Sequence, residues 1–240
     1  MTENRDEAGA DLFTAGWAAY RAVLESDYLW HGMASQALGE LIEEHFGGDV
    51  PIRFLDLACG DAETTSRLFR NRPRARYVGV DRSPQALAAA NTRVANLGPR
   101  AELVTADFVD FLEVRDDQFD VIYVGLSAHH LREAGLRRFF AAIVRRLTPS
   151  GVFAAYEPFT LPDETRDEHI DRLCQIVDHY WLNMSAEHRV TLKTHFREND
   201  YPIALRQWNL LASAGGLCSA RTVLKTPDRL YQLVAHSLAN

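Results

Sequence analysis

The amino-acid sequence predicts an α/β fold in which helices connect the strands of a mostly parallel sheet. Between residues 52 and 156 short apolar runs alternate with amphipathic stretches, and a helical region precedes them. At 54–63 an apolar run ends at an acidic residue and passes through small residues into a helix. Alternating strands and helices indicate a parallel sheet, because parallel neighbours need a crossover connection.

The expected elements follow one another along the chain. Helical spacing covers 11–46, and Gly47-Gly48 ends its second helix. The expected strands are 52–57, 76–80, 102–106, 119–125 and 151–156, and the helices between them are 62–71, 84–96 and 132–147. Ser83 before Pro84 marks one helix start.

The last third of the chain differs in character. Residues 160–200 are rich in charge, histidine and aromatic side chains at helical spacing, so they predict a helical insertion. A helix is expected at 203–213, followed by a closing hairpin of two short strands at 217–224 and 230–235. We therefore expect a single domain over 1–240, with a core of 50–158 and 203–240 and a helical cap from 9–46 and 160–202.

Composition limits the classes of partner. The chain has 240 residues and a net charge of −7. This negative charge disfavours a broad phosphate-binding face. A local arginine cluster at 67–76 is most simply a solvated surface. Three distant cysteines without CxxC spacing indicate reduced thiols in the cytoplasm, and the polar N-terminus predicts neither export nor membrane insertion. No metal is expected, because no tight His/Asp/Glu cluster is visible along the chain.

The turn after the first expected strand predicts a nucleotide-like ligand. A dinucleotide site needs G-x-G-x-x-G, but the chain has Ala58, Gly60 and Glu63 at those positions. No lysine follows, which also disfavours a triphosphate loop. Acids near the helix start favour a ligand with an ammonium group, such as an amino-acid-bearing nucleoside.

Four segments carry a family resemblance. They are Asp56-x-Ala58-x-Gly60-x-Ala62, Tyr77–Ser83 with Asp81 at a strand end, Thr105-Ala106-Asp107-Phe108, and Phe119–Leu131 with His129-His130-Leu131. In this order, over about residues 50–158, they resemble the class I S-adenosylmethionine-dependent methyltransferases. The last segment is similar to the small-molecule subgroup of that family. Alanine replaces two of the usual glycines in the first motif, which is tolerated where φ is negative.

The resemblance implies a doubly wound, Rossmann-like sheet of seven strands, with an antiparallel edge strand and a helical lid. It also implies S-adenosylmethionine as cofactor, with Asp81 on the ribose hydroxyls, Asp107 on the adenine amine and Phe108 beside the ring. The expected cofactor-binding residues are Asp56, Ala58, Gly60, Asp81, Arg82, Asp107, Phe108, Leu126 and Ser127.

The acceptor side is less constrained by the sequence. His130, and after it His129, are the candidates for a catalytic base, because imidazole has a suitable pKa at neutral pH. Capping of the next helix or packing is the structural alternative for both. Tyr28, His31 and Glu157 are the expected contacts to the acceptor.

The expected function is transfer of a methyl group to O, N or C of a small organic acceptor, by a monomer or homodimer that binds neither nucleic acid nor membrane. Two alternatives stay open. One is an RNA-modifying relative, tRNA-directed or other, that uses S-adenosylmethionine or a carboxylated form of it. The other is a cofactor-binding module without chemistry, which the two alanines of the first motif favour.

Overall fold

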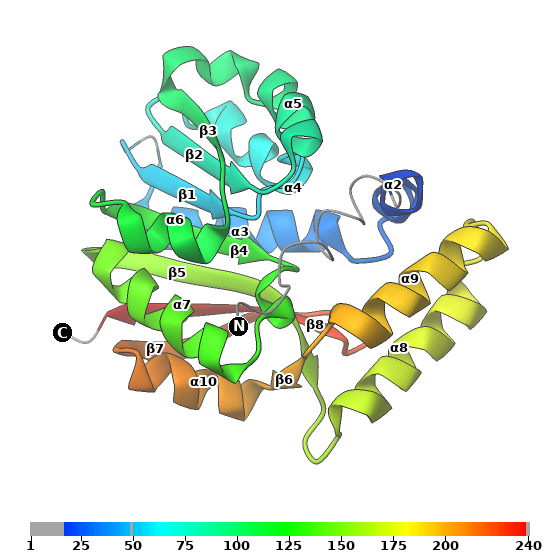
Figure 1. Cartoon of the computed structure of the whole chain (residues 1–240). Helices are drawn as coiled ribbons and strands as arrows, with labels where there is room; N and C mark the ends of the chain where they lie inside the picture. The colour runs from blue at the N-terminus through cyan, green and yellow to red at the C-terminus, as the bar shows by residue number, and fades with distance from the viewer. Residues whose placement is uncertain (1–16, 49, 239–240) are drawn as a thin grey trace, which may run out of the picture.

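The computed structural model describes residues 17–48 and 50–238, so residues 11–16 of the first expected helix lie outside the described part (Figure 1). The helices are α2 (Trp17–Glu25), α3 (His31–Phe46), α4 (Glu63–Ser66), α5 (Pro84–Arg93), α6 (Phe108–Val114), α7 (Glu133–Arg146), α8 (Arg166–Tyr180), α9 (Ala186–Asn199) and α10 (Leu205–Ala214). Short 3-10 helices are η1 (Arg67–Asn71), η2 (Ala95–Arg100) and η3 (Ala128–His130). The strands are β1 (Arg53–Leu57), β2 (Arg76–Asp81), β3 (Ala101–Thr105), β4 (Phe119–Gly125), β5 (Leu147–Thr160), β6 (Ile203–Ala204), β7 (Leu217–Lys225) and β8 (Tyr231–Leu238).

The sheet has the order β3-β2-β1-β4-β5-β8-β7, and the two-residue β6 pairs with the end of β5. Strands β1 to β5 are mutually parallel where they pair, which confirms the predicted α/β fold with a mostly parallel sheet. The expected closing hairpin is β7–β8. The antiparallel strand is β8, which lies one place inside the edge between β5 and β7. The expectation of an antiparallel edge strand is therefore wrong in position.

Helices cover both faces of the sheet (Figure 1). Successive strand residues alternate between two apolar cores, so that Phe54 packs with Leu38 of α3 on one face. Leu55 packs on the other face with Phe139 of α7 and Trp208 of α10. Helix α3 contacts β7 and β8, so it packs on the sheet, whereas the sequence placed it in the helical cap.

Helices α8 and α9 form the expected helical insertion and lie beyond the strand ends, next to α2 (Figure 1). Thr165 and Glu168 start α8 with a reciprocal capping box, in which each side chain accepts the other's backbone N–H. Ile170, Leu173 and Val177 of α8 are buried. This apolar side fixes the helix pair against the rest of the molecule, and its action as a lid stays a prediction.

The turn after β1 has an unexpected backbone. Ala58, Gly60 and Ala62 have φ values of 52°, 55° and 57°. Neither alanine therefore has the negative φ at which alanine replaces glycine without strain, because the chain passes from the strand into α4 through three left-handed residues. Such a conformation costs an L-residue roughly 1–2 kcal/mol relative to glycine.

We predict that Ala58→Gly raises the free energy of unfolding by about 1 kcal/mol, because it relieves left-handed strain at a half-buried site. Ala62→Gly should leave the free energy of unfolding nearly unchanged. It relieves the same strain, but Ala62 is 1% exposed and its methyl group loses packing worth about 0.8 kcal/mol. Urea unfolding measures both variants. Ala86→Gly, inside the regular helix α5, is the control and should destabilise the protein. A loss of stability in Ala58→Gly as large as in Ala86→Gly would contradict the strain.

Candidate functional site

A cavity of about 980 Å³ opens at the carboxyl ends of β1, β2, β4 and β5. Open α/β sheets bind ligands at this edge. All nine residues expected from the sequence to bind the cofactor line it, namely Asp56, Ala58, Gly60, Asp81, Arg82, Asp107, Phe108, Leu126 and Ser127. His129, His130 and His31 line it as well. Tyr28 and Glu157 do not, so the structure places these two expected acceptor contacts behind the cavity wall.

Asp81 joins two turns at the edge of the cavity. Its Oδ2 accepts the N–H of Gly60 at 2.8 Å and its Oδ1 accepts the N–H of Ser83 at 2.8 Å. Burial raises the pKa of this carboxyl, although the backbone donors act in the opposite direction. Each oxygen keeps lone-pair capacity for a ligand hydroxyl, because an ionised carboxylate has about four acceptor sites.

Asp107 and Phe108 form the neighbouring wall. Asp107 caps α6 through its Oδ1, which accepts the N–H groups of Val109 and Asp110 at 2.8 and 3.1 Å. Its Oδ2 lies 3.4 Å from Nε of Arg82. The Phe108 ring is held edge-to-face against Phe139, with 5.5 Å between the centroids. The ring therefore presents a fixed apolar surface to the cavity.

Asp56 is buried below the turn. Its Oδ2 accepts the hydroxyls of Thr65 at 2.6 Å and Tyr77 at 2.8 Å. Burial raises the pKa of this carboxyl to about 7, and the two hydroxyl donors only partly offset that effect. Asp56 therefore ties β1 to α4 and β2, besides lining the cavity.

Glu157, at 1% exposure, organises the loop after β4. Its Oε1 accepts the N–H groups of Ser127 and Ala128 at 3.0 and 2.9 Å. Its Oε2 lies 3.2 Å from the backbone N and 2.7 Å from Nδ1 of His129. With these partners, Glu157 positions His129 instead of facing the acceptor as the sequence had suggested.

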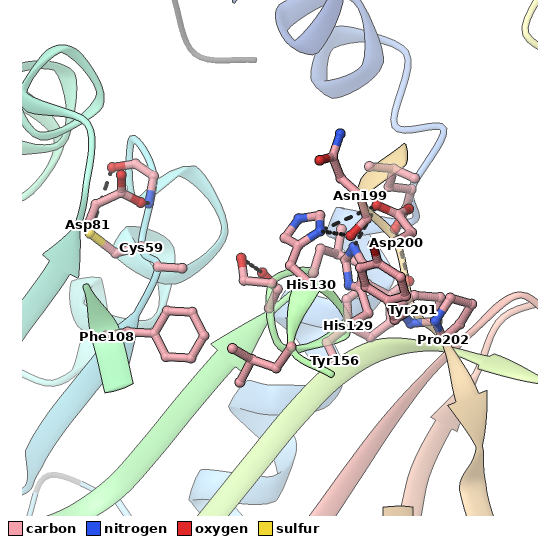
Figure 2. A pocket seen from close by; sticks show the side chains of 18 of the residues that line it. Cys59, Asp81, Phe108, His129, His130, Tyr156, Asn199, Asp200, Tyr201 and Pro202 are labelled. Atoms are coloured by element: carbon pink, nitrogen blue, oxygen red, sulfur yellow. Dashed lines mark hydrogen bonds and ion pairs between the residues drawn. The ribbon is translucent and has the colours of Figure 1, made fainter. Parts of the chain in front are cut away.

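Three imidazoles surround the carboxylate of Asp200, which follows α9. Oδ1 of Asp200 is 3.6 Å from Nε2 of His129, 3.3 Å from Nδ1 of His130 and 3.7 Å from Nε2 of His195. Figure 2 shows His129, His130 and Asp200 together on the side of the cavity opposite Asp81, Cys59 and Phe108. The sequence missed Asp200, and the expectation of no tight His/Asp cluster is wrong for this reason.

The charges in this cluster are coupled. Burial lowers the pKa of His129, but Asp200 and Glu157 outweigh it, so that the pKa is raised. Burial raises the pKa of Asp200, and the surrounding histidines outweigh it, so that the pKa is lowered. Burial lowers the pKa of His195 to about 4. The structure therefore favours an ionised Asp200 among imidazoles.

The remaining wall is apolar and comes from α2, α8 and α9. Leu173, Trp181, Leu192 and Phe196 contribute to it. Tyr28 stacks on Trp181 with 5.0 Å between ring centroids, and its hydroxyl accepts the N–H of Asn183. Tyr28 thereby holds this wall from behind.

Two members of the arginine cluster at 67–76 are engaged by other groups of the chain. Arg72 is buried and donates to the carbonyls of Gly47 and Gly48 and to Glu43, at the end of α3. Arg67 forms an ion pair with Glu63. None of the helices in the described part of the chain combines the length and apolar character that a membrane crossing needs.

Comparison with known proteins adds to this geometry. Residues 54–151 match a family model described as a methyltransferase domain. Over 111 residues the chain is 32% identical to trans-aconitate 2-methyltransferase of Acidovorax sp., covering 46% of this chain and 40% of that protein. It is 26% identical over 82 residues to ribosomal RNA small subunit methyltransferase H of Prochlorococcus marinus, covering 34% and 27% of the two chains. The chain thus spans less than half the length of these relatives.

Two solved structures share the fold over almost the whole chain. The plantazolicin methyltransferase BamL, in complex with a triazolic desmethylPZN analog and SAH, has a TM-score of 0.69 at 13% identity, and the match covers 97% of this chain and 95% of that one. The DhpI–SAH complex has a TM-score of 0.61 at 15% identity and covers 99% of both chains. The chain shares its α/β fold with these two proteins.

We predict that Asp56→Asn stabilises the protein at alkaline pH. The carboxyl has a pKa of about 7 in the folded chain against an ordinary 3.8, so folding takes up a proton between these values. Stability therefore falls as the pH rises from 4 to 7. The neutral amide avoids this loss and can still accept both hydroxyls, for a gain of up to about 4 kcal/mol at pH 8.

Urea unfolding at pH 4, 6 and 8 checks the prediction, with Asp116→Asn as the fully exposed control. The gain in Asp56→Asn should shrink toward pH 4. Parallel pH profiles for the wild type and Asp56→Asn would contradict it.

Proposed function

We propose that this protein is an S-adenosylmethionine-dependent methyltransferase that acts on a small organic acceptor. The observation that carries the proposal is a single cavity with two unlike sides. Strand-end acids and Phe108 form one side, and histidines form the other (Figure 2). Apolar side chains from α8 and α9 complete the side of the histidines. A methyl donor and its acceptor need such adjacent compartments.

The cofactor side fits the donor chemistry. Asp81 would accept the ribose hydroxyls, Asp107 would accept the adenine amine, and Phe108 would pack against the ring. These residues lie inside the matched segment 54–151, and neighbours of the same fold are solved with SAH. Both observations support S-adenosylmethionine as the cofactor.

The loop after β4 would separate the two compartments. Leu126 has a φ of 52°, and its N–H donates to the carbonyl of Tyr156 at 2.7 Å. This left-handed residue and Ser127 line the cavity where the methyl group would transfer. Methyl transfer from a sulfonium is an in-line displacement, so alignment of the acceptor and exclusion of water contribute most of the rate.

The acceptor side favours a molecule of modest size. The cavity wall there is formed by apolar side chains and by His31, His129 and His130. His130, and after it His129, remain our candidates for a catalytic base that faces the acceptor, in keeping with the His-His-Leu subgroup. Tyr28 and Glu157 would act from behind the wall by positioning other residues. Helices α8 and α9 would serve as the lid.

The two alternatives are separable from this proposal. An RNA substrate is suggested by the match to a ribosomal RNA methyltransferase, but the net charge of −7 and the engaged Arg67 and Arg72 weigh against it. A steep loss of RNA affinity with salt would favour that alternative. A module without chemistry would bind the cofactor but transfer no label from methyl-labelled S-adenosylmethionine to any pool of small acceptors.

The three free cysteines are compatible with a reducing cytoplasm.

We predict that calorimetric titration detects binding of S-adenosylmethionine and SAH. Asp81→Asn should weaken it by about 1–3 kcal/mol, or roughly 5- to 150-fold, because ribose hydroxyls lose a charged acceptor. Asp116→Asn, outside the cavity, is the matched control. An unchanged affinity in Asp81→Asn would refute the ribose role, and no binding below millimolar concentration in the wild type would refute the proposed function.

A further inference from the structure

The cluster around Asp200 contains a buried carboxylate oxygen that forms no hydrogen bond. Asp200 is 4% exposed, and its Oδ1 is buried without a hydrogen-bond partner. A buried carboxylate oxygen without a hydrogen bond is costly, and such groups are normally hydrogen-bonded or bound to a metal. Here the nearest groups are ring nitrogens of His129, His130 and His195.

The distances do not describe hydrogen bonds. The three nitrogens lie 3.3–3.7 Å from Oδ1 of Asp200, beyond the usual 2.7–3.2 Å of an N–H···O bond. Two ligands of a tetrahedral zinc ion, with bonds of about 2.0–2.1 Å, lie about 3.3–3.4 Å apart. The ligand atoms of His129, His130 and Asp200 are all within 4.8 Å of one another. Small side-chain movements would therefore bring them into one coordination sphere.

The surroundings prepare His129 to act as a ligand. Its Nδ1 is 2.7 Å from Oε2 of Glu157, so the ring donates there and leaves Nε2 free on the side of Asp200. Metal-binding histidines commonly have this carboxylate behind them, which fixes the tautomer and raises the basicity of the ligand nitrogen. Nδ1 of His130 also lies 3.1 Å from the carbonyl of Asn199, a contact that an ion would replace.

We propose that His129, His130 and Asp200 bind a divalent transition-metal ion of the zinc class, with His195 as a neighbouring fourth ligand. Two or three imidazoles with one carboxylate suit zinc and similar ions, whereas magnesium and calcium prefer all-oxygen sites. These residues line the cavity, so the ion faces the compartment of the acceptor. An oxygen of the acceptor is the natural further ligand.

Coordination changes the role expected for the two histidines. A ring nitrogen that binds an ion cannot accept a proton at that atom, so His129 and His130 would orient the acceptor through the metal. Metal binding itself does not depend on the proposed function. A chain that binds zinc but not SAH would uphold this inference and refute the other.

The test is titration of the full chain, stripped with a chelator, with Zn²⁺ by calorimetry and with Co²⁺ by visible absorption. We expect one ion per chain and the intense absorption of four-coordinate cobalt. Asp200→Asn and His130→Ala should each weaken zinc binding by at least 10-fold. His130 is exposed, with 36% of its side chain accessible, so its variant provides a test even if Asp200→Asn fails to fold.

His179→Ala is the matched control, because His179 is exposed on α8 and lies outside the cavity. Its zinc affinity should equal that of the wild type. The proposal is overturned by absence of zinc binding, by equal affinity in the wild type and His130→Ala, or by a loss in His179→Ala as large as in His130→Ala.

Discussion

The carboxylate of Glu157 is the group on which the arrangement of the cavity depends. Glu157 lies on β5, and its carboxylate accepts the backbone N–H groups of the loop after β4 and the Nδ1–H of His129. These donors are buried or partly buried, and removing the acceptor would leave them without partners at a cost of 1–3 kcal/mol each. The carbonyl of His129 in turn accepts the N–H of Tyr201 at 2.7 Å, which brings the segment after α9, with Asp200, to the cavity.

Asp81 repeats the same principle at another strand end. A buried carboxylate must find donors, and at the carboxyl edge of a parallel sheet the nearest ones are the N–H groups of the turns that follow the strands. Asp81 takes those of Gly60 and Ser83, as Glu157 takes those of the loop after β4. These strand-end acids thus fix the conformation of the loops. The fixed loops and the remaining lone pairs of the carboxylates form the surface that contacts a ligand.

The sequence predicted the parts of the molecule that are local in the chain. Strand-end residues such as Asp81 and Asp107 follow directly from the apolar runs before them, and both line the cavity. Helix α6 was not predicted, because its seven residues are too few to show helical periodicity. The left-handed conformation of Ala58 was not predicted, because the turn imposes this φ on a residue type that rarely adopts it. The role of Asp200 was not predicted, because only the tertiary fold brings it close to His129. No periodicity or spacing along the chain relates the two residues.

The two sides of the cavity come from different parts of the chain, and only one of them lies wholly inside the segment that is similar to other proteins. The matched segment 54–151 supplies Asp81, Asp107 and Phe108, as well as His129 and His130. The other wall, with Trp181, His195 and Asp200, comes from outside that segment. Two proteins can therefore share the donor side and differ completely in the residues that meet the acceptor. Under the proposed function, the choice of acceptor would therefore depend on the chemistry of α8, α9 and the segment after them, where a buried carboxylate lies among histidines.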